Sequence, residues 1–263
     1  MGRPVVVSAE EEEMIRMHVR MTGAIALCLA LGVSALALAD GAGDNEAFVD
    51  GAVKPRKLAK KEYKPIALFT EVRTEGPVTA VTGTHQNPEK ELIEFDRDGA
   101  WKSNAAPRCT ANIETPGLTT DQARGMCPAG SYIGSGEAEV NLGPARVSDI
   151  TVSVFNGPAK NEIRLHTSSP TLTTAAPTVF GEIVKSGSKK FGPALLVEDA
   201  PDAGGDVFMI TKFNATIFKS SGVSLARCKD KRFVTRRTVT YDDGSQDVAT
   251  DRQRCKQKKS GGN

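Results

Sequence analysis

From residue 65 onward, apolar and polar residues alternate in short runs that are typical of β-strands. In residues 162–167, for example, Ile163 and Leu165 fall on one face, because side chains along a strand point to alternate sides. The same alternation places His166 on the opposite, polar face. Similar runs, bounded by Gly, Pro, Asn or Asp, predict strands over residues 66–74, 91–96, 132–142, 149–155, 162–167, 178–186, 193–199, 207–219 and 222–228.

Two more predicted strands flank the acidic sequence DDGSQD. Asp243-Gly244 is a favoured pair for a two-residue hairpin turn, since both residues tolerate positive φ angles. The register that follows pairs Val239 with Val248. It also places Arg236 opposite Asp251, and both pairings stabilise a hairpin. The acidic sequence is therefore interpreted as a turn, with a calcium site as the alternative.

Helical signals are sparse in this sequence. One short helix is predicted over residues 119–127, where Thr119 or Thr120 can cap the first turn. Many short strands with little helix predict an all-β fold, an antiparallel β-sandwich with a barrel as the alternative. We expect one such domain over residues 65–257, followed by a disordered tail over residues 258–263.

The N-terminal region has the features of a secretory signal peptide over residues 1–39. Its long apolar run ends in an Ala-Leu-Ala sequence, which predicts cleavage between Ala39 and Asp40. An acidic run near the start does not fit the positively charged beginning of a signal peptide. We therefore expect translation to begin at Met14 or Met17.

Basic residues gather in two places outside the predicted strands. Residues 40–64 show no sustained periodicity and are predicted to form a flexible basic linker, in which KPRKLAKKEYK carries six basic residues and one acid. The second place is the sequence CKQKK, which begins at Cys255. Such runs are usually solvated, and their alternative role is attraction to an anionic envelope surface. The formal net charge of the whole chain is only +2.

Four cysteines remain once the signal peptide is removed, an even number that predicts two disulfides in an oxidising compartment. Four cysteines can pair in three ways. The combination of Cys109–Cys127 with Cys228–Cys255 is preferred over the other two combinations, because each of its disulfides closes a short loop. A tight turn after Cys228 would hold it too far from Cys255 for a disulfide. The chain after Arg252 is therefore expected to leave the strand ladder. No C-x-x-C pair occurs, which argues against zinc and thioredoxin chemistry.

Several short motifs occur in a recognisable order: IEFDRDGAW, APRC, YIGSGEAEV, VFNGP, LARC and TYDDGS. In this order and spacing the chain resembles a group of exported, functionally uncharacterised all-β proteins of bacteria. The similarity spans roughly residues 65–255. It implies a secreted β fold in a bacterium, and it implies no catalytic residue.

Two acidic loops are candidates for calcium, which prefers six to eight oxygen ligands. The stronger candidate lies beside a glycine pair, with Glu198, Asp199, Asp202 and Asp206 as ligands. The weaker one offers Asp96 and Asp98 in the sequence FDRDGAW, where RDGA also reads as a hairpin turn. No other cofactor is predicted.

The sequence contains no complete catalytic motif. His85 and His166 are isolated, and GVSLA around Ser224 lacks both the last glycine of a nucleophile elbow and a later histidine. We therefore predict a secreted, non-enzymatic protein with a structural or binding role at the cell envelope or outside it. The alternatives are a hydrolase that uses only carboxylates and a calcium-stabilised module that binds carbohydrate or protein.

The expected partners follow from this localisation. An anionic envelope polymer and an extracellular protein both fit the charge of the chain. Nucleic acid does not, because the basic residues are not interleaved with aromatic ones. The mature chain is expected to contain no transmembrane helix.

Overall fold

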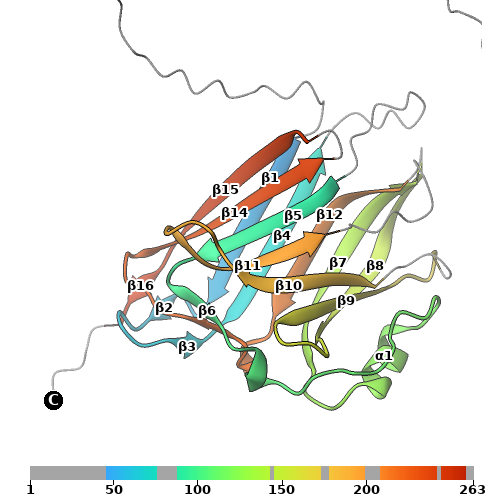
Figure 1. The fold of residues 1–263 in the computed structure, drawn as a ribbon, viewed down its shortest axis with the longest axis horizontal. Coiled ribbons are helices and arrows are strands. Elements are labelled where there is room, and N and C mark those ends of the chain that lie inside the picture. The colour runs from blue at the N-terminus through green and yellow to red at the C-terminus, as the bar shows by residue number, and fades with distance from the viewer. Residues whose placement is uncertain are drawn as a thin grey trace, which may run out of the picture. The chain divides into compact units, whose positions relative to one another are not determined.

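The computed structural model describes residues 46–75, 88–142, 145–172, 178–198, 208–241 and 244–258. The predicted signal peptide, the Ala39-Asp40 cleavage site and the start at Met14 or Met17 lie outside these residues, as does most of the predicted tail. The described part of the chain is dominated by one antiparallel sheet of eleven strands (Figure 1).

The sheet runs in the order β1 (Glu46–Lys54), β4 (Ala67–Glu75), β12 (Phe208–Ile217), β7 (Tyr132–Leu142), β8 (Ala145–Asn156), β9 (Glu162–Ser168), β10 (Val179–Lys185), β11 (Phe191–Glu198), β5 (Pro88–Asp96), β14 (Arg232–Tyr241) and β15 (Gln246–Arg254). A three-stranded sheet contains β3 (Lys64–Pro65), β13 (Ser224–Ala226) and β6 (Gly99–Trp101). A third, two-stranded sheet pairs β16 (Lys256–Gln257) with β2 (Lys57–Leu58).

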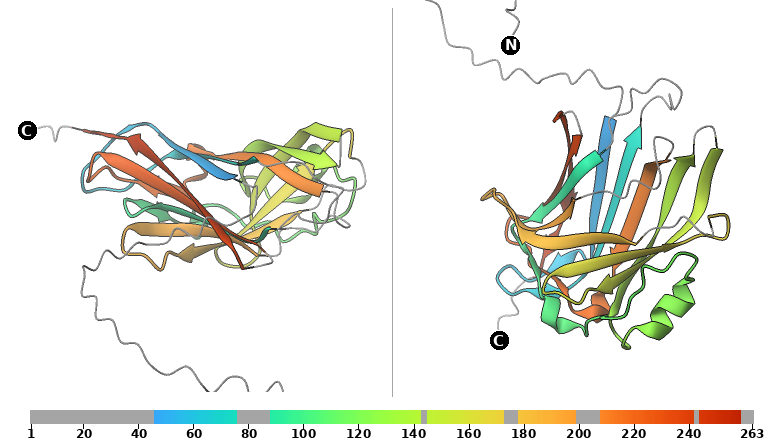
Figure 2. Two further views of the ribbon diagram at one scale, coloured as in Figure 1. Left: turned by 90° about the horizontal axis from the view of Figure 1, so that it is seen from above. Right: turned by 45° about the vertical axis from the view of Figure 1, so that its right-hand side comes forward.

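The large sheet curls until it is nearly barrel-shaped, which confirms the predicted all-β antiparallel class. Figure 2 shows two facing walls, with β9, β10 and β11 in one and β1, β4, β12 and β7 in the other. No ladder joins the edge strands β1 and β15 within the described residues, so side chains close the seam. This single curled sheet corresponds to the barrel alternative.

Apolar side chains of the alternating strands fill the space between the walls. The main cluster includes Val152 and Val154 of β8, Ile163 and Leu165 of β9, and Ile217 of β12. The inward orientation that the alternation predicts for Ile163 and Leu165 is therefore confirmed.

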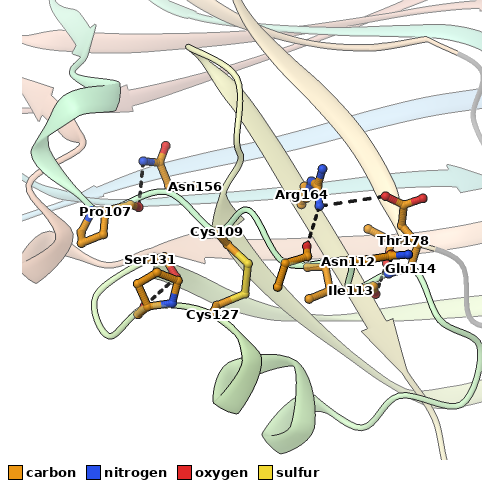
Figure 3. The surroundings of a disulfide bond; sticks show 12 residues. Pro107, Cys109, Asn112, Ile113, Glu114, Cys127, Ser131, Asn156, Arg164 and Thr178 are labelled. Atoms are coloured by element: carbon orange, nitrogen blue, oxygen red, sulfur yellow. Dashed lines mark hydrogen bonds and ion pairs between the residues drawn. A yellow bond between two sulfur atoms is a disulfide. The ribbon is translucent and has the colours of Figure 1, made fainter.

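The outer face of β8 and β9 is also covered, which the sequence pattern did not indicate. Residues 103–131 lie over it and carry α1 (Thr120–Met126) and the Cys109–Cys127 disulfide, whose α-carbons are 4.9 Å apart (Figures 1 and 3). The Nδ2 atom of Asn156 donates to the carbonyls of Ser103, Ala106 and Pro107 at 2.9 to 3.0 Å. The disulfide therefore closes the cover on itself, and the hydrogen bonds of Asn156 fasten it to β8.

This cover corrects the prediction for His166. This residue is only 2% exposed, because residues 103–131 cover the outer face of its strand at this point. Helix α1 begins as predicted, with Thr119 as the N-cap. Its side chain accepts from the amide of Gln122, whose own side chain accepts from the amide of Thr119.

The prediction of a flexible linker over residues 40–64 is wrong for its described part. Residues Glu46–Lys54 form β1, which pairs along its whole length with β4. Val49 and Val53 point into the core and offset the weak strand propensity of the glycine and aspartate between them. Further along, β2 and β3 are two-residue strands of the smaller sheets.

The predicted register of the last hairpin is wrong by one residue. Val239 pairs with Asp247, and Thr238 pairs with Val248. The amide of Tyr241 donates to the carbonyl of Ser245 at 3.0 Å, so three residues separate the arms, with Gly244 at a φ of 81°. Asp243 lies outside the described residues. Since one extra loop residue shifts every pairing, Arg236 faces Thr250 rather than Asp251.

The second disulfide joins Cys228 and Cys255 with 6.1 Å between α-carbons. The expected departure from the ladder after Arg252 does not occur, because pairing continues to Arg232 opposite Arg254. The chain from Cys228 does not turn tightly: Lys231 adopts a φ of 60° and its carbonyl accepts from the amide of Cys255 at 3.1 Å. The two disulfides are therefore the two pairings preferred from the sequence.

A candidate cationic binding face

The two basic runs of the sequence lie side by side in the structure. Strands β2 and β16 pair in parallel, with Lys57 opposite Lys256 (Figure 1). The amide of Lys256 donates to the carbonyl of Arg56 at 2.8 Å, and that of Lys258 to the carbonyl of Leu58 at 2.7 Å. Segments about 200 residues apart in sequence thus form one surface.

A third basic segment, residues 229–232, joins the same surface. Disulfide Cys228–Cys255 fixes it next to β16, and the side-chain amide of Gln257 donates to the carbonyl of Lys229 at 2.8 Å. Arg232 of β14 lies directly opposite Arg254 of β15. The three segments therefore meet through backbone contacts and a covalent bond.

We define the cationic face by its exposed lysines and arginines. They are Lys54, Arg56, Lys57, Lys60, Lys61, Lys64, Lys229, Lys231, Arg232, Arg252, Arg254, Lys256 and Lys258. Two acids interrupt these segments, and each forms an ion pair: Glu62 with Lys64, and Asp230 with Arg97. The hydrogen bond from Arg97 lowers the pKa of Asp230, which keeps this carboxylate charged.

Like charges face each other twice on this face. Lys57 is opposite Lys256, and Arg232 is opposite Arg254. None of these four side chains forms an ion pair with another described residue. Because like charges in directly opposite strand positions are destabilising, the free protein carries an electrostatic cost here that an anion would relieve.

Asp98 holds the third segment in place. It is fully buried; its Oδ1 accepts from Nε of Arg227 at 3.0 Å and its Oδ2 from the amide of Lys229 at 2.6 Å. The Asp98 hydrogen bond raises the pKa of the Arg227 guanidinium. A buried carboxylate thus anchors the residues on both sides of Cys228.

Neighbouring Asp96 also accepts hydrogen bonds from two backbone amides. Its Oδ1 accepts from the amide of Asp98 at 2.8 Å and its Oδ2 from the amide of Val234 at 3.1 Å. Burial raises its pKa, while these two hydrogen bonds lower it. The intervening turn is not a hairpin, because β5 pairs with β11 and β14 whereas β6 pairs with β13.

The stronger calcium candidate is described only in part. Glu198 ends β11, and its Oε1 accepts from Nζ of Lys90 at 2.9 Å. Asp199, Asp202 and Asp206 lie outside the described residues. Within the residues that the structure does describe, no group of three potential metal ligands occurs. The calcium site stays a prediction.

The remaining candidates for chemistry are engaged in structural contacts. Ser224 is 2% exposed, and its hydroxyl donates to the carbonyl of Ile66 at 2.7 Å. Glu94 is equally buried, forms an ion pair with Arg236 and accepts from the Ser186 hydroxyl. The hydrolase alternative requires two carboxylates that converge in a cleft, whereas Glu94 and Asp98 each form an ion pair with a separate arginine, Arg236 and Arg227. His85 lies outside the described residues.

The cationic face as a unit was not predicted from the sequence. Its two ends were recognised as basic runs, but the only signal for their proximity was the preferred pairing of Cys228 with Cys255, which lies next to one of them. The two-residue pairing of β2 with β16 is too short to be found by periodicity.

In comparisons with known proteins, no family model matches this chain and no curated protein matches it. The structure contains two disulfide-bonded cysteine pairs, whereas the resemblance, export and bacterial origin stay predictions. Among the described residues, no helix has the length and apolar character needed to cross a membrane.

Proposed function

We propose that the protein is a non-enzymatic binding protein of the cell envelope or the extracellular space, and that its cationic face binds an anionic polymer. The observation that carries the proposal is the opposition of Lys57 to Lys256 and of Arg232 to Arg254, none of which forms an ion pair with a described acid. The polymer would carry repeated carboxylate or phosphate groups, spaced along a chain that can contact several cations at once. Two disulfides support an oxidising location.

A polymer fits this surface better than a lipid bilayer. Stable attachment to a membrane usually combines basic residues with an inserted apolar group. The exposed large apolar side chains of the described residues are Met126, Phe180 and Val248, and none belongs to the segments of the cationic face. The attraction is therefore purely electrostatic, which suits a hydrated polyanion.

Recognition of single-stranded nucleic acid would require exposed aromatic rings for base stacking. The aromatic residue of these segments, Tyr63, is half-buried, and the guanidinium of Arg227 lies 4.7 Å from its ring centre. This ring is already stacked, so we favour a polymer recognised by charge alone.

Binding to defined polyanions tests the proposal. Polygalacturonate supplies carboxylates and polyphosphate supplies phosphates, while neutral dextran and vesicles of phosphatidylglycerol serve as comparison ligands. We expect calorimetric titration to show binding to at least one polyanion but not to dextran. The affinity should fall steeply between 20 and 200 mM salt, because bound cations on the polymer are released.

Charge-reversal variants locate the site. Lys57→Glu combined with Lys256→Glu should weaken polyanion binding roughly 30-fold or more at low salt, since each cation contributes about 1 kcal/mol near a charged layer. Lys160→Glu combined with Lys189→Glu makes the same change in net charge at exposed positions outside the face. Equal losses in the two double variants, or binding to vesicles without binding to polyanions, would contradict the proposal.

A further inference from the structure

His166 is enclosed between β9, which carries it, and the cover over residues 103–131. Ser153 of β8 lies directly opposite it in the strand ladder. One ring nitrogen forms a hydrogen bond with the backbone of Leu118 in the cover. The other, Nδ1, is buried and has no hydrogen-bond partner within the described part of the chain. A neutral imidazole needs one acceptor for its single N–H, whereas the protonated ring needs two, so this environment fits the neutral form.

The charged groups around His166 offer no compensation for a proton. Arg164 lies two positions away on the same face of β9 and is itself a cation. The described acids of the surrounding elements are engaged elsewhere or exposed: Glu114 and Glu162 pair with Arg164, Asp121 pairs with Arg124, Asp149 accepts from Ser169 and Thr171, and Glu182 of β10 is exposed. Burial therefore lowers the pKa of the His166 imidazole.

The part of the cover above His166 is separable from the core of the barrel. It has its own small apolar cluster, which contains Ile113, Ala123 and Phe155 together with the Cys109–Cys127 disulfide (Figure 3). The main cluster lies on the inner face of β8 and β9. Movement of the segment between the two cysteines would thus leave the main cluster packed, and the disulfide would keep the segment attached at its base.

Few polar contacts hold helix α1 on the sheet. The hydroxyl oxygens of Thr120 and Ser168 are 2.9 Å apart, and the Ser153 hydroxyl donates to that of Thr120 at 3.4 Å. The third contact is the hydrogen bond between His166 and Leu118, the only one of the three that involves a group able to titrate between pH 5 and 8.

We propose that the segment between Cys109 and Cys127 is an acid-released flap, which lifts from the outer face of β8 and β9 when His166 takes up a proton. The disulfide limits this motion to a local opening, which uncovers Phe155 and the apolar side of α1. A charge on the imidazole gains water in the open state, whereas in the closed state it lacks a second acceptor. The flap is independent of the cationic face, and neither depends on the other.

The direction and size of the effect follow from proton linkage. In the open state His166 is solvated and has its ordinary pKa near 6.5, which is above that of the closed state. The open state therefore binds the proton more readily, and opening becomes more favourable as the pH falls below about 6.5. Between pH 7.5 and pH 5.0 the equilibrium constant for opening should rise several-fold, with an upper limit of about 30-fold.

Amide hydrogen exchange at these two pH values tests the inference. The amide of Ala123 donates to the carbonyl of Thr119 at 2.9 Å and reports on α1. Its protection factor, in which the pH dependence of chemical exchange is divided out, should fall several-fold from pH 7.5 to pH 5.0. The amides of β14 should keep their protection over the same range, because a local opening does not reach them.

Two variants assign the effect to one histidine. In His166→Gln the ratio of the Ala123 protection factors at the two pH values should be close to one. In the control His85→Gln, which removes a histidine outside the described residues, the ratio should match that of the unmodified protein. Since each protein is compared with itself, a variant that is looser at both pH values still gives a valid ratio.

Three results would overturn the proposal. The first is a ratio near one for Ala123 in the unmodified protein. The second is an equal loss of protection in β14, which would show global unfolding instead of a local opening. The third is the same ratio in His166→Gln as in the unmodified protein.

Discussion

The amide of Gly51 donates a hydrogen bond to Oδ2 of Asp251 at 3.0 Å, across 200 residues of sequence. Gly51 lies in β1 and Asp251 in β15, the two edges of the large sheet. A β-carbon on Gly51 would lie 2.2 Å from Oγ1 of Thr235 in β14. At this point of the seam, the strands can approach this closely only because residue 51 has no side chain, and the contact helps to cover two sheet edges.

Gly51→Ala should destabilise the protein by about 1–3 kcal/mol, because the new methyl group overlaps Thr235. Chemical denaturation followed by circular dichroism measures this change in the free energy of unfolding. Thr235→Ala in the same background makes room and should recover part of the loss. If the double variant is as unstable as the sum of the single variants, residues 51 and 235 are not in contact.

Two valines test the register of the last hairpin. Val239 is completely buried whereas Val248 is 60% exposed, although a two-residue turn would have made them partners. Val239→Ala should cost about 2 kcal/mol through lost burial and a cavity. Val248→Ala should stay within about 0.5 kcal/mol of the unmodified protein. Similar losses in both would contradict the observed register.

Protonation of His166 at acidic pH should lower the free energy of unfolding of the protein. Burial lowers the pKa of its imidazole in the folded state, and a hydrogen bond to the backbone of Leu118 only partly opposes this. The unfolded chain, with a pKa near 6.5, therefore binds the proton more readily than the folded chain does. The free energy of unfolding should fall as the pH drops below about 6.5, and the loss should level off below the folded-state pKa.

The non-titrating variant His166→Gln isolates this effect from that of the carboxylates. Urea denaturation at pH 7.5 and at pH 5.5 should show a larger decrease for the unmodified protein than for the variant. An identical decrease in both proteins would mean that His166 does not take up a proton on unfolding in this range.

The two disulfides should have separable roles. Loops of 18 and 27 residues imply that each contributes about 3 to 3.5 kcal/mol by restricting the unfolded chain. Replacing Cys228 and Cys255 by serine should also reduce polyanion binding, since this bond fixes the cationic face. Replacing Cys109 and Cys127 should lower the melting temperature while polyanion affinity measured below it is retained. If both replacements changed polyanion affinity equally, the Cys228–Cys255 disulfide would have no special role in holding the cationic face.

Most strands of the large sheet could be predicted from the sequence because they obey a local rule. Alternation with period two is visible within six residues, as Ile163 and Leu165 show. Helix α1 was predictable for a similar reason, since Thr119 and Gln122 form its capping box within one turn. These signals require no knowledge of neighbouring strands.

Features that depend on distant contacts could not be predicted. His166 follows the polar alternation of its strand, yet the cover over residues 103–131 buries it. The hairpin register depends on loop length, and the two-residue turn predicted at Asp243-Gly244 gave a register that is wrong by one residue. Asp98 seemed a surface turn residue, and its burial follows from Arg227, which lies 129 residues away in sequence.

The pairing of β2 with β16 has a consequence for when the cationic face forms. Its last rung joins Leu58 to Gln257, so the cationic face does not exist until almost the whole described chain has been synthesised. A nascent chain that has folded as far as β14 lacks Lys256 and the partner of Cys228. For the proposed polyanion binding, this order of assembly means that a chain still being synthesised lacks the completed face, which forms only when β16 pairs with β2.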